Sequence, residues 1–110
     1  MVLAMAAKAK KLTQAQRLLR THLQELGIET VPEFRFAEGR RWRFDLADLN
    51  SHTAYEVDGG KWHGGHRRGK ALEDDYERQN SAILDGWRLL RFTNEQVMDG
   101  RALAWLKEWL

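Results

Sequence analysis

Three acidic side chains near the middle of the chain could hold a divalent metal ion. Asp45 lies in the segment RWRFDLA (41–47), and Glu56 and Asp58 lie in the segment TAYEVD (53–58). If the two segments form an antiparallel pair, an in-register alignment brings Asp45 opposite Glu56, with Asp58 on the same face. Mg²⁺ takes one or two carboxylates and keeps positions for water and substrate phosphate. The alternative is that these acids are solvated on an outward strand face.

A basic, glycine-rich loop follows these acids directly. The segment GGKWHGGHRRGK (59–70) contains five glycines, two histidines and four Lys or Arg residues. Cations on an adaptable backbone bind phosphates without reading sequence, and an aromatic ring can stack on a base. The residues expected to contact nucleic acid, in this loop and on the neighbouring strand, are Lys61, Trp62, Arg67, Arg68, Lys70, Arg41 and Arg43. The competing interpretation is a solvated basic loop. We expect instead that the acids hold the metal and the loop holds the phosphate.

Two histidines of this loop have side chains that titrate near neutral pH. His63 or His66 could protonate a leaving oxygen, activate a water molecule or contact phosphate. A zinc site would have to use carboxylates such as Asp58, because the chain has no cysteine. Phosphate contact is the role that we expect.

The remaining pattern predicts the elements that position these side chains. Helix signals are the capping pair Thr13 and Gln16 before a helix ending near Gly27, the periodic segment 70–85, and the pair Thr93 and Gln96 before a terminal helix. Strand signals cover the phenylalanines after Pro32, then 41–47 with Trp42, Phe44 and Leu46 on one face, 53–58, and WRLLRF at 87–92. The predicted order is helix, three strands, helix, strand, helix.

Composition sets the broad class. The 110 residues form a single predicted domain, with residues 1–12 as a flexible or helical basic lead-in. Hydrophobic residues make up 43%, charged residues 31%, and no apolar run reaches the roughly 18 residues that cross a bilayer. We therefore expect a soluble protein without a membrane partner. The absence of cysteine favours the cytoplasm, and the net charge of +2 is only a weak sign of nucleic-acid binding.

The motifs RWRFDLAD, YEVDGGKWHGGHRRGKALEDDYERQN and GWRLLRFT resemble those of a known family. In this order they are similar to small phage and bacterial endonuclease-like proteins of the PD-(D/E)XK superfamily, relatives of the very-short-patch repair endonucleases. The resemblance covers residues 31–98. It implies an α/β (α+β) fold with a restriction-endonuclease-like mixed sheet, in which the strand 87–92 joins after a helical crossover.

The resemblance also implies site roles. Asp45 matches the central metal-binding aspartate and Glu56 the acid of the (D/E)XK strand, with Mg²⁺ or Mn²⁺ as cofactor. Asp58 stands where the family has lysine, and we expect it to be a third metal ligand or to orient water. Asp75 and Arg78, one helical turn apart, either point toward the site or form a surface ion pair. Arg78 could only orient or stabilise charge, because arginine stays protonated.

The function that follows is a metal-dependent DNA endonuclease, a nickase or structure-specific nuclease of phage or bacterial DNA repair or recombination. The missing lysine favours a rival, a nucleic-acid-binding protein of the same fold that has lost cleavage. A third interpretation, a phage structural or assembly protein, rests on the tryptophan-rich segment AWLKEWL (104–110), which could also form a homodimer surface.

Overall fold

The computed structural model describes residues 11–59 and 69–110. The elements in chain order are α1 (Gln14–Glu25), β1 (Val31–Arg35), β2 (Arg43–Asp48), β3 (Thr53–Asp58), α2 (Lys70–Leu84), β4 (Arg88–Thr93), α3 (Asn94–Met98) and α4 (Arg101–Trp109). The predicted order of helices and strands is confirmed, except that the terminal helix is two helices.

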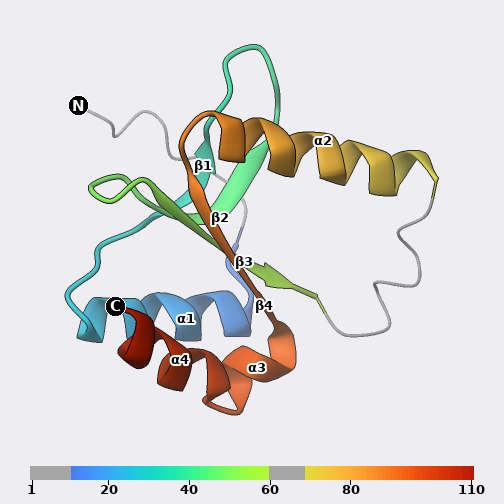
Figure 1. The fold of residues 1–110 in the computed structure, drawn as a ribbon. Helices are drawn as coiled ribbons and strands as arrows, with labels where there is room; N and C mark the ends of the chain where they lie inside the picture. Colours follow the sequence, from blue (N-terminus) through green and yellow to red (C-terminus); the bar gives the residue numbers. More distant parts are fainter. Residues whose placement is uncertain (1–10, 60–68) are drawn as a thin grey trace.

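The four strands form one mixed sheet in the order β1-β2-β3-β4. β1–β2 and β2–β3 are antiparallel, whereas β3–β4 is parallel and is connected through α2. Pro32 lies in β1, an edge strand, where proline is tolerated because only one side of the strand is paired. Figure 1 shows α2 on one side of the sheet and α1, α3 and α4 on the other. The predicted mixed sheet with a helical crossover is therefore confirmed.

Each face of the sheet has its own apolar core. Leu46 of β2 and Tyr55 of β3 pack against the layer formed by α1, α3 and α4. Phe44 of β2 and Ala54 of β3 pack on the opposite side with Ala82 of α2. Because β3 is covered on both faces, its polar side chains on the α2 side must find partners within the protein.

The prediction that Phe44 and Leu46 share one face is wrong. They belong to different cores, although they are two residues apart on one strand. The β1–β2 ladder skips one step, at Glu33 and Asp45, and Glu33 has a left-handed backbone with φ of 53°. This irregularity interrupts the strict alternation of side chains on which the prediction depended.

Both predicted capping boxes are present. The hydroxyl of Thr13 accepts a hydrogen bond from the Gln16 N–H (3.1 Å), and the Gln16 side chain accepts one from the Thr13 N–H (2.9 Å). Thr93 and Gln96 form the same pair of bonds at 3.0 Å each. The terminal helix is broken at Gly100, whose φ of 92° is left-handed, so α3 and α4 run in different directions.

None of the helices in the described ranges has the length and apolar character that crossing a membrane requires.

Candidate active site

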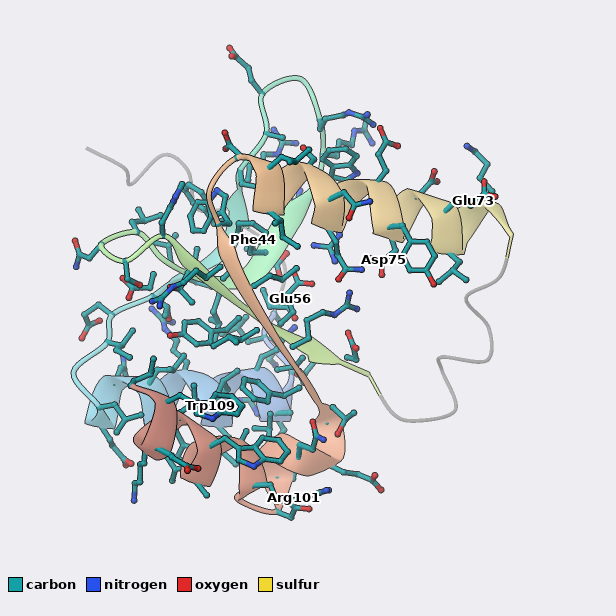
Figure 2. The ribbon with its side chains drawn as sticks, in the orientation of Figure 1. Phe44, Glu56, Glu73, Asp75, Arg101 and Trp109 are labelled. Carbon is teal, nitrogen blue, oxygen red and sulfur yellow. The ribbon has the colours of Figure 1, made fainter. Side chains whose placement is uncertain are left out.

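Glu56 lies at the centre of a buried ionic cluster on the α2 side of the sheet. It is on the inner strand β3 and is only 5% exposed. The guanidinium of Arg78, from α2, donates hydrogen bonds to both of its carboxylate oxygens, with Nη1–Oε2 and Nη2–Oε1 distances of 2.9 and 2.7 Å. Figure 2 shows Glu56 below the face of α2 that carries Asp75. This bidentate geometry, with two charge-assisted hydrogen bonds, makes a strong arginine–carboxylate pair.

Arg78 also holds its own helix to the sheet. Its Nη2 donates to Asp75 Oδ1, one helical turn away, at 3.0 Å, and its Nη1 donates to the backbone carbonyl of Arg43 at 3.3 Å. The Gln79 amide lies 3.5 Å from the other oxygen of Asp75. The expectation that Asp75 and Arg78 face the same way is confirmed. They point toward Glu56 and do not form an exposed surface pair.

Arg91 of β4 is a member of the cluster that the sequence analysis did not single out. The parallel register places it beside Glu56. It donates to Asp58 Oδ1 at 2.8 Å and to Asp75 Oδ2 at 3.4 Å, and so links β3, β4 and α2. A cation between the apolar residues Leu90 and Phe92 is the signal available in the sequence.

Asp45 lies next to Glu56 across the β2–β3 pair. The ladder stops at Leu46 and Tyr55, one step before these acids. There the Asp45 carboxylate accepts a hydrogen bond from the backbone N–H of Val57 at 2.8 Å. A side-chain oxygen thus takes up a backbone donor where the strands separate, and this fixes the carboxylate of Asp45 near that of Glu56.

The electrostatics of Glu56 follow from this arrangement. Burial raises the pKa of Glu56 above its ordinary value, the negative charge of Asp45 raises it further, and the hydrogen bonds and charge of Arg78 oppose both effects. Burial alone would lower the pKa of Arg78, but the hydrogen bonds and charges of Glu56 and Asp75 outweigh it and raise that pKa. Arg78 therefore remains charged beside Glu56, whose pKa is raised in spite of that charge.

Asp58 has a different partner from Asp45 and Glu56. Asp58 is bound to Arg91, and its side chain is 47% exposed. Across residues 11–59 and 69–110 no group of three His, Asp or Glu side chains is arranged to hold a metal ion. Asp45 and Glu56 lie one step beyond the last residue pair of the β2–β3 ladder, and the charge of Asp45 acts on Glu56. Two carboxylates suit Mg²⁺, which fills its other positions with water and phosphate. Asp58 as a third ligand stays a prediction.

The predicted nucleic-acid contacts are only partly within the described residues. Arg41 and Lys70 are exposed, and Lys70 Nζ lies 3.6 Å from Asp74 Oδ1. Arg43 is half-buried, with its Nη1 3.6 Å from Glu33 Oε1. The expected contacts and catalytic groups that lie outside the described residues are Lys61, Trp62, His63, His66, Arg67 and Arg68.

Glu33 is a second acid that the sequence analysis did not single out. It is buried and has a left-handed backbone, an uncommon combination for a residue other than glycine. Glu33 and Asp45 stand opposite each other in the β1–β2 ladder but are not paired, whereas the residues on either side of them are. Nothing in the local sequence, where it follows Pro32, indicates this conformation.

Comparison with known proteins gives one informative result for this arrangement. No family model matches the sequence, and no curated protein matches it either. The fold is similar to that of a known endonuclease catalytic domain. The catalytic domain of the homing endonuclease I-Bth0305I matches with a TM-score of 0.65 over 88% of this chain and 93% of that one. The two sequences are 20% identical, so the similarity concerns the fold.

Proposed function

We propose that this protein is a metal-dependent DNA endonuclease of the PD-(D/E)XK superfamily, related to the very-short-patch repair endonucleases. The observation that carries the proposal is the buried Glu56 beside Asp45, on neighbouring strands of a fold that is similar to an endonuclease catalytic domain. Two neighbouring carboxylates disfavour each other's ionisation, and the buried one is affected most. A cation bound between the two carboxylates would favour the ionised form of both.

Asp45 and Glu56 would hold Mg²⁺ or Mn²⁺. Their mutual repulsion, which contributes to the raised pKa of Glu56, is what a divalent ion would relieve. Such an ion, when bound, makes a coordinated water acidic and offsets charge at the scissile phosphate. The Val57 N–H holds the Asp45 carboxylate in place for this role.

The other residues of the cluster would orient and balance the acids. Arg78 fixes the plane of the Glu56 carboxylate and cannot accept a proton. Arg91 holds Asp58 at the end of β3, where the exposed part of that carboxylate is able to orient a water molecule. Arg41 and Lys70, both exposed, would contact phosphates of the DNA backbone.

The substrate in this proposal is DNA in a bacterial cell or a phage-infected host. We infer a nickase or structure-specific nuclease of DNA repair or recombination, acting in the cytoplasm. A homodimer would allow both strands of a duplex to be cut.

The test is cleavage by the purified full chain of linear, mismatched, flapped and four-way DNA, with Mg²⁺, Mn²⁺ or EDTA. Asp45→Asn should abolish cleavage and leave the fold intact, because an asparagine oxygen can still accept the Val57 N–H. Asp99→Asn, an exposed change, is the matched control and should cleave like the wild type. Unchanged cleavage by Asp45→Asn would contradict the proposed site.

One observation favours a second candidate, a DNA-binding protein that does not cleave. Arg78 already occupies both oxygens of Glu56, and position 58 has an acid where the family has lysine. In that case wild type and Asp45→Asn should bind DNA with the same salt dependence, and neither should cleave under any metal condition.

A further inference from the structure

A groove lies on the side of α2 that faces away from the ionic cluster. Its volume is about 900 Å³, and its walls are the outward face of α2 and the loop between β1 and β2. The loop contributes Phe36 and Glu38, and the helix contributes residues from Glu73 to Leu84. Figure 1 shows this loop rising beside the C-terminal half of α2.

The floor of the groove is apolar and exposed. Tyr76 and Leu84 lie two helical turns apart on one side of α2 and are 55% and 88% exposed. Ile83, next to this line, is 54% exposed. Large apolar side chains that gather in a hollow and remain in water mark a binding surface more often than isolated ones do.

The rim of the groove is acidic. None of the described lining residues is Lys or Arg. Four carboxylates line the groove, those of Glu38, Glu73, Glu77 and Asp85. Arg40, beside the groove, pairs with Glu77, and no Lys or Arg of residues 11–59 and 69–110 forms an ion pair with the other three. A surface of this sign repels the phosphates of nucleic acid. It also disfavours a symmetric contact with the same surface of a second copy, which would bring like charges together.

The groove is separate from the candidate active site. Asp75 and Arg78 extend from the opposite side of α2 toward the sheet. Figure 2 shows Asp75 on the sheet side of the helix and Glu73 at its N-terminal end, pointing to the other side. A molecule in the groove would therefore not cover Glu56.

We propose that this groove binds a basic amphipathic helical segment of a partner protein. Two apolar side chains of the segment, one or two turns apart, would contact Tyr76 and Leu84. Lysine or arginine side chains beside them would pair with Glu73 and Glu38 at the rim. The proposal does not depend on nuclease activity, and either can fail without the other.

The test uses two synthetic helical peptides of about 15 residues, a length at which isolated helices become stable in water. Both have leucines at i, i+4 and i+7; one has lysines and the other glutamates on the flanking positions. Each is titrated into the isotopically labelled full chain at about 0.15 M salt. We expect the lysine peptide to shift backbone signals of residues 36–38 and 73–85, and to bind at least tenfold more tightly than the glutamate peptide.

Matched variants locate the contact. Leu84→Ser and Tyr76→Ala should each weaken the lysine peptide at least tenfold, and both are exposed changes that should not disturb the fold. Glu73→Lys should weaken the lysine peptide and strengthen the glutamate peptide. Met98→Ser, which removes an exposed apolar side chain from α3, is the control and should change nothing.

Five results would overturn the proposal. The first four are no saturable binding up to millimolar peptide, equal affinity for both peptides, signal shifts centred outside the groove, and displacement of the peptide by a short DNA duplex. A fifth is concentration-dependent self-association of the chain that Leu84→Ser removes, which would make a second copy the occupant. Sedimentation of the wild type and Leu84→Ser distinguishes this last case.

Discussion

Arg78 of α2 donates one hydrogen bond to each carboxylate oxygen of Glu56 on β3, at 2.9 and 2.7 Å. The protein itself thus supplies the positive charge that a buried acid needs. An ion that binds Asp45 and Glu56 must share the Glu56 carboxylate with this guanidinium. The charges of Asp45 and Arg78 act on the pKa of Glu56 in opposite directions. Their relative strength therefore sets the charge of Glu56 and its ability to bind a cation.

Changes at Asp45 and Arg78 should move the pKa of Glu56 in opposite directions. Asp45→Asn removes a negative charge that raises this pKa, so the pKa should fall. Arg78→Gln removes a charge and hydrogen bonds that lower it, so the pKa should rise. Carbon NMR of the Glu56 carboxyl group against pH measures both. Shifts of the same sign would show that Asp45 and Arg78 do not act on Glu56 as described.

Arg78→Gln should also destabilise the fold. Breaking a buried pair leaves Glu56 and Asp75 without their main partner, at a cost of about 3–5 kcal/mol in unfolding free energy near pH 7. The folded pKa of Glu56 is raised, so its contribution to stability is present below its unfolded pKa and is lost as pH rises through the folded value. The variant should therefore recover part of its stability in acid. Urea unfolding at several pH values is the measurement.

Two control variants are compared with Arg78→Gln in the same unfolding experiment. Arg78→Lys should keep part of the stability, because an ammonium retains the charge but cannot match both oxygens in one plane. Arg101→Gln breaks a surface pair with Asp99 and should leave the urea midpoint unchanged within error. An Arg78→Gln protein as stable as the Arg101→Gln protein would refute the assigned role.

Arg41 and Arg43 should differ in DNA binding, although both are predicted contacts. Arg41 is exposed, so Arg41→Ala should weaken binding to all sequences alike and reduce the salt slope of log K by about 1. Arg43 is half-buried near Glu33, so Arg43→Ala should chiefly lower stability. Fluorescence anisotropy across salt concentrations, together with urea unfolding, separates the two. Equal salt slopes for both variants would argue against this division.

Thr93→Ala should cost about 1 kcal/mol of unfolding free energy, because it removes the hydroxyl that caps α3. Thr93→Ser keeps the hydroxyl and should keep most of the stability. Thermal or urea unfolding of the three proteins tests the pair. A serine variant as unstable as the alanine variant would point to the lost methyl group and not to the cap.

Gly100→Ala should destabilise the C-terminal layer by about 1 kcal/mol or more, since φ of 92° is strained for a residue with a Cβ. Among residues 11–59 and 69–110 no atom lies within 4 Å of the added methyl, so the cost is conformational. Gly100→Asn should be milder, because asparagine tolerates left-handed backbone better. An alanine variant of unchanged stability would indicate that α3 and α4 can merge into one helix.

The sequence predicts this fold well where signals are local. The capping boxes at Thr13 and Thr93 and the end of α2 near Gly86 depend on side chains a few residues apart, and each is present. The hairpin pairing of β2 and β3 is also a local rule, although its ladder ends at Leu46 and Tyr55, one step before Asp45 and Glu56. Asp75 and Arg78 share a face because helical spacing requires it.

The features that sequence analysis missed depend on long-range geometry. Arg91 joins the cluster only through the parallel β3–β4 register, which no local pattern fixes. The left-handed backbone at Glu33 interrupts the alternation that placed Phe44 and Leu46 together, and glutamate gives no sign of it. The break between α3 and α4 is the exception, because Asp99 and Gly100 repeat the Asp-Gly pair that follows the last residue of α2 and are a local stop signal.

The parallel β3–β4 pair has a consequence for folding kinetics. The hairpins β1–β2 and β2–β3 join segments adjacent in the chain, whereas β4 must return to β3 after the whole crossover. Loop closure over such a distance is slow, so we expect β4 to dock late. Glu56, Arg78 and Arg91 come from three elements that meet only at that step. A partly folded or nascent chain would then lack the assembled cluster, and any activity that depends on it would arise only when the last strand is in place.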